Sequence, residues 1–260
     1  MKYCLSGRQP LSVLKKCDEV KMQYVDKDRI LDSIETLSDK MITLDIPAEL
    51  KAEDLNWTLF KMYSEKVNFA LCLHDLSLVY SCKEYKIKFY WAYPITSFFE
   101  LRGIINLEPC YLFLGAPLCF DLPKVKALTN IPIRLCPNLA YDAYIPRENG
   151  IYGSWVRPED IGVYEKFVDI FEFETDELKR EQVLLHIYKD NGNWPGNLNL
   201  LFTNFNVNID NRALPEEVGE VRTSCGQRCM SNGTCTFCLT SVKFADIIRK
   251  KHYEGLTSQS

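Results

Sequence analysis

The feature that most constrains the fold of this chain is an alternation of short apolar runs with longer amphipathic segments. The runs are almost continuously hydrophobic, as in residues 111–114, which is typical of parallel strands covered on both faces. The segments between them carry helix signals, such as Asp121 before Pro123 and Pro158 before two acids. Eight runs predict strands at residues 19–24, 41–46, 67–73, 87–91, 110–115, 131–136, 168–173 and 198–205.

Eight strands with helices between them predict a closed (β/α)8 barrel of the TIM type. The length of 260 residues fits one such domain over residues 1–260. An open, doubly wound sheet is the alternative, because periodicity cannot prove closure. The sequence has neither a dinucleotide-binding glycine fingerprint nor a P-loop.

A barrel of this type carries its chemistry at the carboxyl ends of the strands. That rule selects His74, Asp75 and Glu172 as candidate catalytic residues, because they follow or end predicted strands. A hydrolase with Asp75 or Glu172 as base and His74 assisting is one reading, since burial can raise a carboxylate pKa towards neutrality. The alternatives are that Asp75 caps a helix and that Glu172 is a paired charge in the barrel.

Candidate substrate-binding residues lie in two connections. Asn138, Arg147 and Arg157 belong to or flank the long connection 137–156, which is expected to form a lid or binding loop. Asn204 lies at the end of the last predicted strand. The asparagines can instead close turns, and Arg157 can pair with a neighbouring acid.

Histidine content limits the possible metal chemistry. The chain has three histidines, His74, His186 and His252, and they are far apart in the sequence. A site built from several histidines is therefore excluded, and Ser-His-Asp catalysis would depend on His74 alone. His186 is expected to pack within an amphipathic helix.

Four of the eleven cysteines lie close together near the C-terminal end, with the spacing C-x3-C-x5-C-x2-C. Four thiolates so close in sequence can bind one metal ion or one iron–sulfur cluster. The compact spacing favours an iron–sulfur cluster, structural zinc is the alternative, and unmetallated thiols stay open. We expect residues 225–238 to form the last loop on the catalytic face, before a closing helix near 241–253. The predicted ligands are Cys225, Cys229, Cys235 and Cys238.

The remaining cysteines are scattered, mostly in apolar runs, and are expected to be buried reduced thiols. Together with the absence of a signal peptide, this predicts a cytoplasmic location. No apolar stretch is long enough for a membrane span. A net charge of -4 gives no strong nucleic-acid signal. The substrate, small molecule or macromolecule, and the oligomeric state stay open.

A barrel with Cys225, Cys229, Cys235 and Cys238 near its C-terminal end resembles the U32 peptidase-like family. Its members include iron–sulfur proteins involved in hydroxylation of RNA bases or of ubiquinone precursors. The resemblance implies a 4Fe–4S cluster with redox or hydroxylation chemistry, or a U32-like peptidase. The family's cysteines are usually spread more widely, and its glutamate-containing signature is not found, so no catalytic residue set is carried over. A non-enzymatic binding protein, or a structural protein of viral or mobile-element origin with structural zinc, is the alternative.

Overall fold

Eight parallel strands form the centre of the molecule. The computed structural model describes residues 1–26, 30, 36–116, 118–138, 154–173, 175, 177–191, 194–202, 210–214 and 216–225. Within these ranges every paired strand is parallel to its neighbours. The strands are β1 (Lys2–Ser6), β2 (Glu19–Gln23), β3 (Met41–Ile46), β4 (Asn68–Leu73), β5 (Lys88–Trp91), β6 (Leu112–Leu114), β7 (Ile133–Leu135) and β8 (Ile170–Glu172).

The strand order shows that the sheet curls into a barrel. Its order is β5-β4-β3-β2-β1-β8-β7-β6, so each strand lies beside its neighbours in sequence and β1 pairs with β8. The two edges meet through a parallel bridge between Tyr90 and Tyr111, and Cys110 N donates to Phe89 O at 2.7 Å. The prediction of a (β/α)8 barrel is therefore confirmed.

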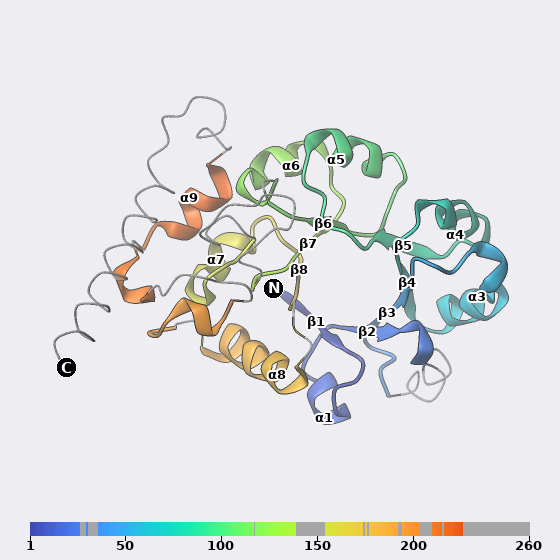
Figure 1. The fold of residues 1–260 in the computed structure, drawn as a ribbon, viewed down its shortest axis with the longest axis horizontal. Coiled ribbons are helices and arrows are strands. Elements are labelled where there is room, and N and C mark those ends of the chain that lie inside the picture. Colours follow the sequence, from blue (N-terminus) through green and yellow to red (C-terminus); the bar gives the residue numbers. More distant parts are fainter. Residues whose placement is uncertain are drawn as a thin grey trace, which may run out of the picture.

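Helices surround the ring of strands, as Figure 1 shows. Helix α5 begins with a capping box, in which the Ser97 hydroxyl accepts from Glu100 N and the Glu100 carboxylate accepts from Ser97 N. The helices of the described ranges are α1 (Leu11–Leu14), α3 (Trp57–Lys66), α4 (Val79–Tyr85), α5 (Phe98–Ile105), α6 (Leu122–Leu128), α7 (Ile161–Tyr164), α8 (Leu178–His186) and α9 (Val218–Ser224).

Hydrophobic packing is concentrated between the strands and the helices. Val20, Ile42, Leu71 and Phe171 are at most 1% exposed and belong to one buried cluster with residues of the helices. Because successive residues of a strand point to opposite faces, their neighbours in sequence point into the barrel. Those inward positions are unusually polar for a barrel of this class, whose interior is normally filled by branched aliphatic side chains.

The described residues contain eight strands, as predicted, but one predicted strand is wrong and one observed strand was missed. The first strand, Lys2–Ser6, was not predicted, although it pairs with both β2 and β8. The prediction of a strand at residues 198–205 was wrong for its described part, since Leu198–Leu200 is a 3-10 helix. Its apolar residues Leu198, Leu201 and Phe202 are instead buried in the core.

The chain continues beyond the barrel after α8. Helix α8 follows β8 and packs on β1, so it is the closing helix of the barrel. Helix α9 packs against α6 and α7 on the outside of the ring (Figure 1). Cys225 follows α9 directly, so the cysteine segment belongs to this C-terminal extension and not to the loop between β8 and α8. The predicted helix near 241–253 lies outside the described residues.

Candidate functional site

The candidate site lies at the carboxyl end of the barrel, and strand register determines which side chains meet there. Asp45 on β3 is the register partner of Cys72 on β4, and of Gln23 on β2. Lys21 lies two residues before Gln23, on the same face of β2. These inward side chains are joined by His74, which directly follows Leu73 at the end of β4.

His74 and Asp45 form a close pair at this mouth. The His74 Nε2 atom lies 2.9 Å from Asp45 Oδ1, and the ring of Tyr93 stands edge-on to the imidazole at 5.1 Å. Burial alone raises the pKa of Asp45, but the hydrogen bond from His74 and the charge of Lys21 outweigh it, so the pKa lies below its ordinary value. Asp45 is therefore a carboxylate that orients the imidazole.

Lys21 lies between two carboxylates. Its Nζ is 2.9 Å from Glu172 Oε1 and 3.7 Å from Asp45 Oδ2. Burial lowers the pKa of Lys21, but the charges around it, with Glu172 the largest contribution, raise the pKa well above its ordinary value. The side chain is thus held as an ammonium ion at the mouth of the barrel.

Arg134 on β7 forms the floor below this ammonium ion. Its guanidinium donates to Glu172 Oε2 at 2.6 Å and also pairs with Glu19, and it is completely buried. The rings of Tyr90 and Tyr111 lie 4.3 and 4.9 Å from its central carbon. The result is a continuous charged network through the barrel interior, in which the positive groups alternate with carboxylates.

The network lowers the pKa of Glu172. Burial by itself raises this pKa, but Lys21 and Arg134 outweigh burial and lower the pKa to about 2. Glu172 is therefore a permanent carboxylate near neutral pH, and a weak base. Glu172 therefore fits the alternative of a paired charge in the barrel better than it fits the role of a general base.

A cavity of about 160 Å³ opens at this mouth. Glu181 on α8 also lines it, and burial raises the pKa of this carboxyl above its ordinary value. Its two oxygens accept hydrogen bonds from Ser6 N and Gln9 Nε2. The charged side chains that line the cavity are Arg8, Lys21, Asp45, Glu172 and Glu181.

Side chains able to bind a metal are also gathered at this mouth. One ligand atom each from Asp45, Cys72 and His74 lies within 4.8 Å of the other two. Among the described residues, these three form the group of His, Cys, Asp or Glu side chains that is close enough together to bind one metal ion. Burial raises the pKa of the Cys72 thiol to about 12.

Of the three predicted catalytic residues, the structure brings His74 and Glu172 to the mouth. Asp75 instead caps the 3-10 helix Leu76–Leu78, since its Oδ1 accepts from Ser77 N at 2.8 Å. This is the capping role that the sequence left as the alternative.

The predicted binding residues have structural partners where they are described. Asn138 is fully buried and its Oδ1 accepts from the Cys136 thiol at 3.3 Å. Arg157 is buried and donates to both oxygens of Asp160, at 2.7 and 2.8 Å, and to Glu216 O. Arg147 and Asn204 lie outside the described residues.

Among the predicted metal ligands, Cys225 is described. It is partly buried and packs against the core at the end of α9. The preceding turn carries Arg222, whose guanidinium lies over the ring of Trp155 at 3.8 Å. Cys229, Cys235 and Cys238 lie outside the described residues.

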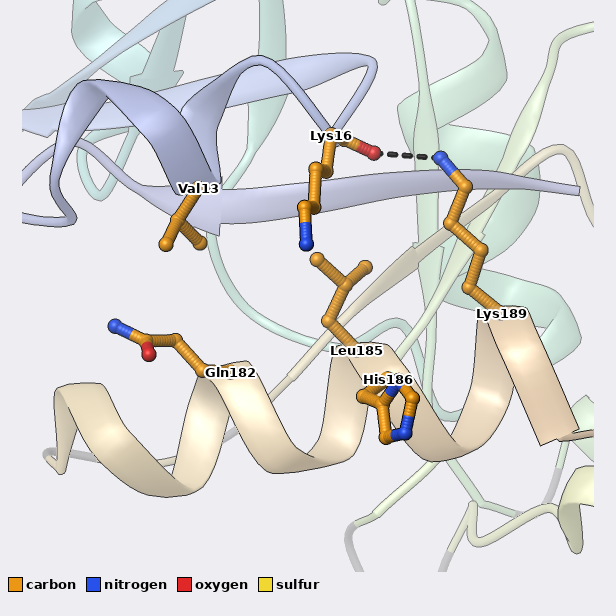
Figure 2. Close-up of a pocket in the computed structure, with 6 residues that line it drawn as sticks. All are labelled: Val13, Lys16, Gln182, Leu185, His186 and Lys189. Atoms are coloured by element: carbon orange, nitrogen blue, oxygen red, sulfur yellow. Dashed lines mark hydrogen bonds between the residues drawn. The ribbon is translucent and has the colours of Figure 1, made fainter.

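Two of the other hollows in the described part of the chain lie beside helices. One, of about 390 Å³, lies between α1 and α8, where the ammonium of Lys189 donates to the carbonyl of Lys16 (Figure 2). His186 is among its lining residues and is exposed, so the expectation that it is packed was wrong. The other, of about 700 Å³, runs along α5. Phe99 lines it and is 89% exposed to solvent. Neither gathers reactive groups as the mouth does.

Sequence reasoning missed the residues inside the strands. Glu19, Lys21, Cys72 and Arg134 were not proposed as site residues. Cys72 continues an apolar run, whereas the other three place a charge in one. A charge inside a run that is otherwise typical of a buried strand is the signal that could have found Glu19, Lys21 and Arg134, because an unpaired charge is too costly to bury.

Comparisons with known proteins leave the family open. No family model and no curated protein matches the chain. Among solved structures, thiamine phosphate pyrophosphorylase from Pyrococcus furiosus is similar over 72% of this chain and 95% of that chain, with 10% sequence identity and a TM-score of 0.32. The fold assignment therefore rests on the strand pairing alone. No helix in the described part of the chain has the length and hydropathy needed to cross a membrane.

Proposed function

We propose that this chain is an enzyme whose active site is the barrel mouth, with acid–base chemistry centred on Asp45 and His74. The observation that carries the proposal is the 2.9 Å contact between Asp45 Oδ1 and His74 Nε2 at the carboxyl ends of β3 and β4. An imidazole oriented by a carboxylate is a recurrent unit for moving protons in enzymes. Active sites of this fold lie at this end of the barrel.

Lys21 supplies the second part of the proposed chemistry. Its ammonium ion lies beside Asp45 at the cavity, where a positive charge stabilises negative charge that develops on a substrate oxygen. Glu172 holds this ammonium ion in place through one carboxylate oxygen, and its other oxygen pairs with Arg134. In this proposal Glu172 is a positioning residue, because a carboxylate with a pKa of about 2 accepts protons poorly.

The cavity limits the substrate to a small polar molecule or to the polar end of a larger one. Its volume is about 160 Å³, and charged groups of both signs line it. A mixed lining of this kind suits a substrate that carries its own hydrogen-bonding groups, since an apolar ligand would leave buried charges without partners.

The test is substrate consumption from a mixture of small polar metabolites, followed by mass spectrometry. The purified wild-type chain is expected to consume at least one compound, and His74→Ala to slow that reaction by about 100-fold or more. His186→Ala is the matched control, because His186 is an exposed histidine on α8, and it should react as the wild type does. Equal rates for the wild type and His74→Ala would refute the proposal.

A second candidate function is suggested by the cysteine segment and adds a metal centre to the barrel. The supporting observations are the C-x3-C-x5-C-x2-C spacing and the packing of Cys225 against the core. An iron–sulfur cluster would supply redox or hydroxylation chemistry, as the resemblance to the U32 peptidase-like family implies. A zinc ion would instead stabilise the C-terminal extension.

Metal analysis after anaerobic purification tests this second candidate. Iron and sulfide with visible absorbance are expected for a cluster, and colourless protein with stoichiometric zinc for the alternative. Cys235→Ser should lower the metal content in both cases, whereas Cys17→Ser, a buried cysteine beside α1, should not. Unchanged metal content and folding in Cys235→Ser would show that these cysteines hold no metal.

A further inference from the structure

We infer that the barrel mouth binds a divalent transition-metal ion, with zinc the best match, through Asp45, Cys72 and His74. One ligand atom from each of these residues lies within 4.8 Å of the other two. None of its three ligands is one of the four cysteines at residues 225–238. The inference rests on the proposed function, because it uses the same mouth.

The register of β3 and β4 brings the three donors together. Asp45 and Cys72 are direct register partners on adjacent parallel strands. His74 follows Cys72 by two residues, so both leave the chain on the same side. The arrangement therefore follows from a Cys-x-His pattern at the end of one strand and an aspartate at the end of its neighbour.

The chemistry of the donors points to the class of ion. Thiolate sulfur, imidazole nitrogen and carboxylate oxygen are the three ligand types that bind zinc in proteins, whereas magnesium and calcium prefer oxygen alone. Three protein ligands with one position left for water is the pattern of catalytic zinc sites. Asp45 also lines the mouth cavity, from which water or substrate can approach the ion.

The nearby charges are compatible with an ion at this place. Lys21 is a cation beside Asp45, but its Nζ is nearer to Glu172, at 2.9 Å, than to Asp45, at 3.7 Å. Two negative ligands, the Asp45 carboxylate and the Cys72 thiolate, would balance the charge of a divalent ion. Cys72 is completely buried, which protects a metal-bound thiolate from solvent and oxidants.

With the ion bound, the roles of the two central residues change. Asp45 and His74 would then hold the ion, and the ion would supply Lewis acidity that lowers the pKa of a water bound at the open position. Cys72 then becomes essential, whereas acid–base chemistry by Asp45 and His74 alone does not require it. Cys72 is therefore the residue that separates the inference from the proposed function.

The experiment measures zinc stoichiometry in the full chain after loading with Zn²⁺ and dialysis. Cys72→Ala and His74→Ala should each bind one equivalent less zinc than the wild type. Cys82→Ala is the matched control, because Cys82 on α4 is also completely buried, and it should bind as much as the wild type. Circular dichroism checks folding, and Cys72→Ser replaces Cys72→Ala if the alanine variant does not fold.

A Co²⁺ titration identifies the ligands independently. In a chain with Cys225, Cys229, Cys235 and Cys238 replaced by serine, one equivalent of Co²⁺ should still bind and give a sulfur-to-cobalt absorption band that Cys72→Ala abolishes. Absence of that band, or equal zinc in folded wild type and Cys72→Ala, would overturn the inference. If Cys72→Ala also keeps full activity while His74→Ala loses it, the inference fails and the proposed function stands.

Discussion

Arg134 is the single residue on which the charged interior of the barrel depends. It is completely buried and pairs with both Glu19 and Glu172. Arg134→Met removes the charge and leaves Glu19 buried without its cation, so we predict a loss of about 3–5 kcal/mol in the free energy of unfolding. Urea denaturation measures this change. Arg212→Met, which breaks an exposed pair with Asp210, is the control and should leave the midpoint unchanged.

Glu172 should make the stability of the protein depend on pH in the acid range. Its pKa is lowered from 4.5 in the unfolded chain to about 2 in the folded protein, so its ionised form is the one that stabilises the fold. That contribution, on the order of 3 kcal/mol, is complete above pH 4.5 and is lost as the pH falls towards 2.

Comparison of the wild type with Glu172→Gln isolates this residue from the other acids. The difference between their free energies of unfolding should shrink as the pH falls from 4.5 to about 2. A difference that stays constant over this range would show that the carboxylate is not held by Lys21 and Arg134 as described.

At the scale of elements, the packing of α9 on α7 can be tested through one glycine. A Cβ on Gly219 would lie 2.7 Å from Asp160 Cγ, and Asp160 cannot easily move because Arg157 holds both of its oxygens. We predict that Gly219→Ala destabilises the protein by about 1–3 kcal/mol in thermal or denaturant unfolding. Gly103→Ala in α5 is the control, since nothing lies within 4 Å of its Cβ. A neutral or stabilising effect at Gly219 would contradict the packing of α9.

The elements also show how far the sequence predicts this structure. Strands with long apolar runs, such as β3 and β4, were predicted at or near their observed bounds. Strand β1 was missed because it is only five residues long and no turn signal precedes it. Its pairing with β2 and β8 in the structure identifies it as a strand. The apolar run after residue 198 reflects burial, not strand pairing, because a buried 3-10 turn has the same composition.

The candidate site was predictable only in part, for a related physical reason. The rule for strand ends selects His74 and Glu172, because it needs no three-dimensional register. It does not reveal that Lys21 and Arg134 reach Glu172 from β2 and β7. Those contacts depend on the pairing of β1 with β8 and on the register of β7 against β8. The capping role of Asp75 and the ion pair of Arg157 are local, and the sequence already allowed both.

At the scale of the whole molecule, the barrel separates two kinds of packing. Apolar side chains fill the space between strands and helices, and charged groups run through the inside of the ring to the mouth. Both kinds of packing stabilise the fold, and the charged interior also holds Lys21 and Asp45 in place at the mouth. The central claim is that substrates bind at this mouth and not in the hollow between α1 and α8 or along α5.

Crystallographic screening with small polar fragments tests that claim most directly. We predict that fragments collect at the barrel mouth, in hydrogen-bond contact with Lys21, Asp45 or His74. Fragments bound only in the hollow between α1 and α8, or along α5, with none at the mouth, would contradict it.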